Sequence, residues 1–110
     1  MMGDMDILAV KQCLGKLKFS NHSRLEMERE SRGIIKVDEI VQALDVGEII
    51  EEYPDDRPYA SCLMLGRTAA GRPLHVVCAP VMDEAQLVVV TTYEPDPALW
   101  EPGFKRRKQS

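Results

Sequence analysis

The side chain best suited to proton transfer in this sequence is His75, which interrupts the apolar run Leu74-His75-Val76. A histidine that is neutral near pH 7 can serve as an acid or as a base. If this run is a strand paired with the next one along the chain, His75 and Tyr93 can share a face of the sheet. The competing interpretation is a hydrogen-bonded core histidine, which is the commoner role inside an apolar strand.

A second histidine and one arginine complete the set of candidates. His22 follows Ser20 in the first turn of a predicted helix, where a surface or capping role is the alternative. Arg57 lies in the loop 54–58, whose prolines and aspartates favour a well-defined turn. Its planar guanidinium could stack on a tyrosine or hold a phosphate, although an arginine in a loop is more often only solvated.

Motifs for cofactors and metals are absent from the sequence. There is no nucleotide-binding glycine loop, no nucleophile elbow and no H-E-x-x-H. Cys13, Cys62 and Cys78 are an odd number of cysteines without a C-x-x-C pair, which argues against a disulfide framework and a zinc ribbon. We therefore expect buried thiols, no cofactor and no metal.

The elements that would position these residues can be placed from apolar periodicity. A first helix is predicted near the N-terminus, capped by Asp4 or Asp6, and residues 17–19 are predicted to be extended. A second helix is predicted at about 21–31, with Ser20 as its N-cap and Leu25 on its core face, and a third at 37–46.

From residue 48 onward the apolar pattern has a period of two. It predicts strands at 48–53, 61–67, 73–79 and 86–93. The connections are short, so consecutive strands should be antiparallel neighbours. Helices followed by strands predict an α+β fold, in which the N-terminal helices pack on one face of a single antiparallel sheet of about four strands.

A chain of 110 residues predicts a single domain spanning residues 1–110. The proline-rich stretch predicts a wrapping segment at 94–104, in which Trp100 packs back over the sheet, followed by a basic disordered tail at 105–110. No apolar run approaches the roughly 20 residues of a membrane span. The acidic N-terminus lacks the basic start of a signal peptide, so we expect a cytoplasmic protein without membrane contact.

Charge is unevenly distributed along the chain, whose formal net charge is −4. Between Asp38 and Asp56 there are eight acidic residues and no lysine or arginine, whereas residues 105–108 are all basic. The acidic run could be only a solvated face, or it could dock a basic protein partner. RNA would have to approach elsewhere, near Arg67, Arg72 and the basic tail.

Several blocks together resemble a bacterial family of small domains of unknown function, DUF4258. They are Ser20-x-His22 with Met27, the run 47–56, Ser61-Cys62-Leu63 with Leu65-Gly66, the run 72–77, and the run 92–97 with Trp100. The resemblance covers about residues 17–107. This family is thought to be similar to the RelE, MqsR and BrnT toxins, which implies a RelE-like fold. Its genes often lie beside one for a zinc-finger antitoxin of the YgiT or MqsA type.

The resemblance implies a toxin-like domain of a type II toxin–antitoxin pair and, as one activity, metal-free mRNA cleavage. His75 or His22 would act as acid or base, Arg57 would neutralise phosphate charge, and Tyr93 would stack or donate. The partners would be a zinc-finger antitoxin and RNA, with no binding to DNA by the domain alone.

Two alternatives remain open at this point. One is a non-catalytic interaction module that binds a protein partner through its acidic surface, and the other is a small-molecule enzyme. An open cleft that brings together His75, Arg57 and Tyr93 would favour the ribonuclease. Burial of His75 in the core would favour the interaction module.

Overall fold

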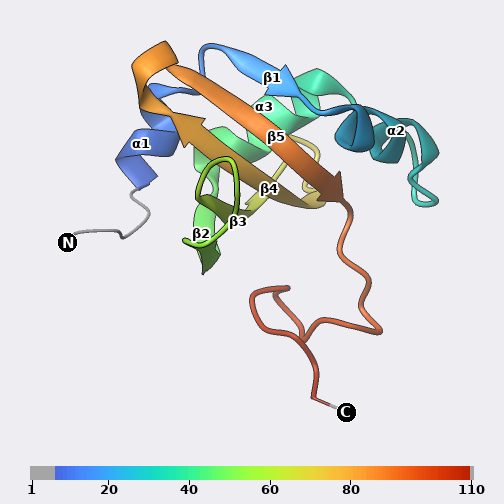
Figure 1. The fold of residues 1–110 in the computed structure, drawn as a ribbon. Helices are drawn as coiled ribbons and strands as arrows, with labels where there is room; N and C mark the ends of the chain where they lie inside the picture. The colour runs from blue at the N-terminus through green and yellow to red at the C-terminus, as the bar shows by residue number, and fades with distance from the viewer. Residues whose placement is uncertain (1–6, 110) are drawn as a thin grey trace.

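The computed structural model describes residues 7–109, so the predicted caps Asp4 and Asp6 lie outside the described residues. No helix in this part of the chain is long and apolar enough to cross a membrane. Figure 1 shows the elements in chain order. They are α1 (Ile7–Gln12), β1 (Leu17–Phe19), α2 (Asn21–Arg29), α3 (Val37–Val46), β2 (Glu48–Tyr53), β3 (Ser61–Arg67), β4 (Pro73–Val81), the 3-10 turn η1 (Met82–Glu84) and β5 (Gln86–Tyr93).

The strands form one sheet in the order β1-β5-β4-β3-β2. Strands β2 to β5 are antiparallel neighbours, as predicted, and the α+β fold class is confirmed. The sheet has one strand more than predicted, because residues 17–19 pair in parallel with β5. Leu17 and Phe19 pack against the hydrophobic core, which explains why so short a segment adds to the sheet edge.

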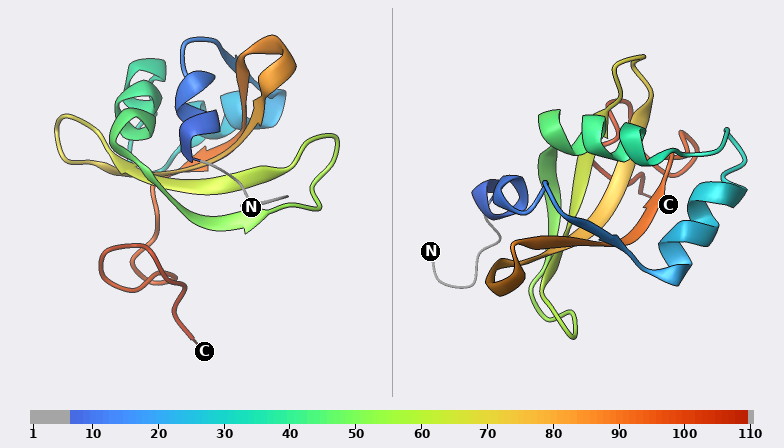
Figure 2. Two further views of the ribbon diagram at one scale, coloured as in Figure 1. Left: turned by 90° about the vertical axis from the view of Figure 1, so that its left-hand side faces the viewer. Right: turned by 90° about the horizontal axis from the view of Figure 1, so that it is seen from above.

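The helices cover one face of the sheet, as Figure 2 shows. Ile40 and Leu44 of α3 are fully buried against apolar side chains of β3 and β4. The helix lies very close to the sheet at Gly66, where an added Cβ would meet the carbonyl oxygen of Ala43 at 1.9 Å. Glycine is therefore required at position 66 for α3 to pack.

The sequence prediction for α2 is partly wrong. Ser20 is the N-cap, and its hydroxyl accepts a bond from the Ser23 amide at 3.0 Å, as expected. Leu25, however, is exposed, and the buried residues of this helix are Ser23 and Met27. These two are four positions apart and so share the helix face that packs on the sheet, which turns Leu25 outward.

Residues 95–109, which we call the strap, lie on the sheet face opposite the helices (Figure 2). The Trp100 side chain is 3% exposed, and its backbone pairs with that of Arg107 across a turn. The basic tail is predicted to be disordered over residues 105–110, of which the structure describes residues 105–109. In the structure, Lys105 pairs with Glu48 of β2 and Arg107 pairs with Glu51. Opposite charge therefore holds the basic end of the chain on the sheet.

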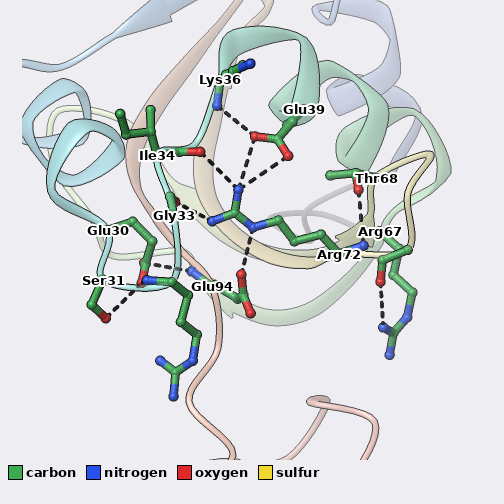
Figure 3. Close-up of polar contacts among 12 residues, drawn as sticks. Glu30, Ser31, Gly33, Ile34, Lys36, Glu39, Arg67, Thr68, Arg72 and Glu94 are labelled. Carbon is green, nitrogen blue, oxygen red and sulfur yellow. Dashed lines mark hydrogen bonds and ion pairs between the residues drawn. The ribbon is translucent and has the colours of Figure 1, made fainter.

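Arg72 connects three parts of the fold, as Figure 3 shows. Its guanidinium donates to Glu39 of α3, to Glu94 after β5, and to the backbone carbonyls of Gly33 and Ile34. Its side chain is mostly buried. Arg72 thus fixes the start of β4 to the α2–α3 loop, and its charge is already paired with two carboxylates.

Candidate functional site

His75 lies on the outer face of the sheet, the face opposite the helices, directly opposite Tyr93 of β5. Its Nδ1 is 3.2 Å from the Tyr93 hydroxyl, and its Nε2 is 2.8 Å from the carbonyl oxygen of Phe104 in the strap. A carbonyl oxygen can only accept, so Nε2 carries the proton and Nδ1 accepts from Tyr93. Both ring nitrogens are thus occupied, and the side chain is fully buried.

Burial also sets the protonation states of this pair. It lowers the pKa of His75 below its usual value, despite the bond to the Phe104 carbonyl, which opposes the shift. Burial likewise raises the pKa of the Tyr93 hydroxyl. At neutral pH the pair is therefore an uncharged imidazole that accepts from an uncharged phenol.

The strap closes over this pair through Trp100. The indole and the imidazole of His75 are in edge contact, with ring centroids 4.4 Å apart and planes at 82°. The guanidinium of Arg107 lies 4.7 Å from the centre of the Trp100 ring, which is cation–π distance. The indole is therefore held between the histidine of the sheet and an arginine of the strap itself.

Arg107 is in turn anchored to β2. Its Nε and Nη2 each donate to a Glu51 carboxylate oxygen at 3.0 Å, which is a bidentate ion pair. The Tyr53 hydroxyl donates to the same carboxylate at 2.6 Å. The bond to Arg107 lowers the pKa of Glu51, while burial and the Glu51 carboxylate raise the pKa of Tyr53 to about 12.

The structure does not bring Arg57 to this site. The loop that carries it begins beyond the Tyr53–Ser61 pair, whereas His75 pairs with Leu65. Four residues of strand separate these two positions along β3, or roughly 13 Å. The guanidinium of Arg57 bonds instead to the carbonyl oxygens of Asp55 and Asp56.

His22 is also separate from the His75 site. Its side chain is 70% exposed, and its Nε2 lies 3.3 Å from a Glu26 oxygen. Glu26 also accepts from the Thr91 hydroxyl and from the Thr92 amide, in the part of β5 that extends beyond its pairing with β1. Of the four predicted site residues, only His75 and Tyr93 are therefore in contact. Among residues 7–109, no cluster of acids, histidines and cysteines is arranged to hold a metal.

The sequence prediction missed Glu51, Tyr53, Trp100 and Arg107 as parts of this site. Glu51 and Tyr53 are two apart on a strand and so share one face, a signal that could have been used. Trp100 was predicted only to pack over the sheet. No periodic pattern in the strap indicates that Arg107 returns to Glu51.

Among protein-family models, that of DUF4258, a domain of unknown function, matches residues 19–94. This segment runs from the end of β1 to the residue after β5 and makes up more than half of the chain. The chain belongs to the DUF4258 family. No curated protein and no solved structure matches it. The DUF4258 match includes His75 and Tyr93 but ends immediately before the strap that covers them.

Proposed function

We propose that this domain is a protein-interaction module, the toxin-like member of a type II toxin–antitoxin pair, that binds its partner through its acidic surface. The main support is the state of His75. Both of its ring nitrogens are bonded, its side chain is buried under Trp100, and Arg57 lies elsewhere. These positions do not form the open set of groups that cleavage of a phosphodiester requires.

The strap supports a role in binding a basic segment. Lys105 Nζ lies 3.1 Å from Glu48, and Arg107 holds Glu51 with two bonds. These acids lie on β2, which forms one edge of the sheet. The strap therefore shows which kind of segment this acidic edge can bind. It is a segment without regular secondary structure that carries two cations two residues apart.

Further acids of the run from Asp38 to Asp56 are exposed outside the part that the strap occupies, on the helix face and in a loop. Asp38 and Asp45 on α3 and Asp55 in the β2–β3 loop are exposed. Exposed carboxylates in excess over cations attract a basic protein and repel RNA. The partner that we propose is a zinc-finger antitoxin of the YgiT or MqsA type. The domain itself would belong to the toxin group that includes RelE, MqsR and BrnT.

The test is a binding titration with the product of the neighbouring gene at two ionic strengths. The variant Asp38→Lys/Asp45→Lys changes acids that do not hold the strap. We expect it to weaken the complex at least tenfold at low salt, and less at high salt because salt screens exposed charges. The matched control is Asp83→Lys/Glu84→Lys, with the same charge change on exposed acids of η1. Equal affinities for the two variants would contradict the proposal.

A second assay distinguishes a binding module from a ribonuclease. Purified protein is incubated with mRNA in the presence of a chelator, and intact RNA is quantified over time. We expect no loss of RNA, because His75 has no free nitrogen. Cleavage that His75→Ala abolishes would overturn the proposal in favour of the enzyme.

A further inference from the structure

A cavity of about 230 Å³ lies between the β2–β3 loop and the outer faces of β1 and β5. Loop residues form one wall and strand side chains form the floor. It is separate from His75 and the strap, none of whose residues line it. The side chains used below are Lys18, Asp56, Arg57, Tyr59, Ser61 and Val90.

Two cations from distant parts of the sequence face this cavity. Lys18 comes from β1, and Arg57 comes from the loop. Within residues 7–109, neither has a carboxylate at ion-pair distance. The two bonds from Arg57 Nη1 to the Asp55 and Asp56 carbonyls, at 3.0 and 3.1 Å, fix its guanidinium in position. The cavity thus has an arginine held by two backbone carbonyls and a lysine whose charge no carboxylate of residues 7–109 pairs.

The remaining walls suit a flat ring. Val90 contributes an apolar floor, and Tyr59, which is 44% exposed, stands at the rim. The buried Ser61 hydroxyl donates to Asp56 at 2.6 Å and so orients that carboxylate. Asp56 can accept from a ring N–H, while a phenol ring offers a stacking surface.

We infer that this cavity binds a nucleoside monophosphate with a single-ring base. Lys18 and Arg57 would pair with the phosphate, Tyr59 would stack on the pyrimidine, and Asp56 would accept from its ring N–H. The size supports a small ligand, because pockets for drug-sized molecules begin at about 300 Å³. The inference does not depend on the protein-binding role proposed above, since none of the five acids named there lines this cavity.

The experiment is a calorimetric titration of the full chain with uridine 5′-monophosphate, with inorganic phosphate and with uridine. We expect saturable binding of the nucleotide, at least tenfold tighter than either part alone, because charge pairing and stacking act together. Amide chemical shifts should move in the loop 54–60 and in β5. No saturable binding of the nucleotide, or equal binding of phosphate or uridine, would overturn the inference.

Two variants locate the site. Arg57→Gln and Tyr59→Ala should each weaken binding of uridine 5′-monophosphate by about tenfold, because each removes one of the two kinds of contact. The matched control is Arg67→Gln, an exposed arginine at the end of β3 that does not line the cavity. All three side chains are exposed, so the fold should persist, and Trp100 emission will verify this. Unchanged affinity for Arg57→Gln would show that the nucleotide binds elsewhere.

Discussion

Trp100 packs edge-on against His75 with ring centroids 4.4 Å apart, and this contact joins the strap to the outer face of the sheet. It is reinforced on either side by the Phe104 carbonyl on the imidazole and by Arg107 over the indole. Trp100 is the single tryptophan of the chain. Its fluorescence therefore reports directly whether the strap is closed.

Arg107→Ala should loosen the strap. The variant loses the bidentate pair with Glu51 and the cation–π contact with Trp100. Because the Arg107 side chain is 60% exposed and water screens its charge, we expect a loss of about 1 kcal/mol in the free energy of unfolding. Trp100 emission should shift to longer wavelength as the indole gains contact with water.

Arg106→Ala is the matched control for that prediction. Arg106 is adjacent in sequence, but its side chain is 85% exposed and pairs with Glu101 of the strap itself. We expect its emission and its melting temperature to match those of the unmodified chain. If both alanine variants shifted the emission equally, the loss of positive charge and not the Glu51 contact would be responsible.

Stability should fall as the solution is acidified below about pH 6.5, the usual histidine pKa. Burial lowers the pKa of His75 in the folded state, so the unfolded chain takes up this proton at a higher pH than the folded chain. The free energy of unfolding therefore decreases as the pH drops from the unfolded pKa through the folded one. Urea unfolding at several pH values between 7 and 5 measures this loss.

The two histidines provide an internal comparison for the pH effect. His75→Gln can keep a donor to Phe104 and an acceptor for Tyr93 but cannot be protonated, so the dependence between pH 7 and 5 should flatten. His22→Gln changes an exposed residue, so this variant should keep the pH dependence of the unmodified chain. A full pH dependence in His75→Gln would assign the effect to another group. The Glu51 carboxylate, whose pKa is lowered by Arg107, acts only at lower pH.

Sequence periodicity predicts the regular elements well because it reflects burial on one face. The bounds of α3 and of strands β2, β3 and β5 coincide with the predicted runs. It fails in α2, where few apolar residues are present and Leu25 and Met27, two apart, cannot share a face. There the packing of Ser23 and Met27 on the sheet decides the orientation.

Charge pairing was harder to predict than the strands. The acids of the run from Asp38 to Asp56 are close in sequence, but Glu39, Glu48 and Glu51 pair with Arg72, Lys105 and Arg107 from distant positions. Such pairs depend on how β4 and the strap are placed in space. For the same reason we predicted from the sequence that Arg57 and His75 share a site, although the β2–β3 hairpin holds them apart.

Arg72→Ala should be among the more damaging substitutions of a polar residue in this chain. It leaves the partly buried Glu39 and Glu94 without their cation and two backbone carbonyls without a donor. We expect a loss of about 3 kcal/mol, measured as a lower urea midpoint. Arg72→Lys should recover only part of it, because one ammonium cannot reach acceptors on several sides.

Arg32→Ala controls for the loss of an arginine near the same loop. Arg32 forms an exposed pair with Asp96, and such pairs contribute at most about 1 kcal/mol. Its urea midpoint should therefore change little. A similar loss in Arg32→Ala and Arg72→Ala would mean that overall charge, and not the Arg72 network, stabilises this region.

Gly66→Ala tests the close packing of α3 on β3. The new methyl group would lie 1.9 Å from the carbonyl oxygen and 2.5 Å from the carbonyl carbon of Ala43, both backbone atoms that no side-chain rotation can move away. The helix must shift from the sheet, which opens the core around Ile40 and Leu44. We expect a loss of at least about 3 kcal/mol in the free energy of unfolding, or an unfolded chain.

Gly15→Ala provides the comparison, because an added Cβ there has no atom within 4 Å among the described residues. Thermal unfolding followed by circular dichroism should show a normal transition for Gly15→Ala and a much lower or absent one for Gly66→Ala. Equal melting temperatures for the two variants would show that α3 does not pack at this distance from the sheet.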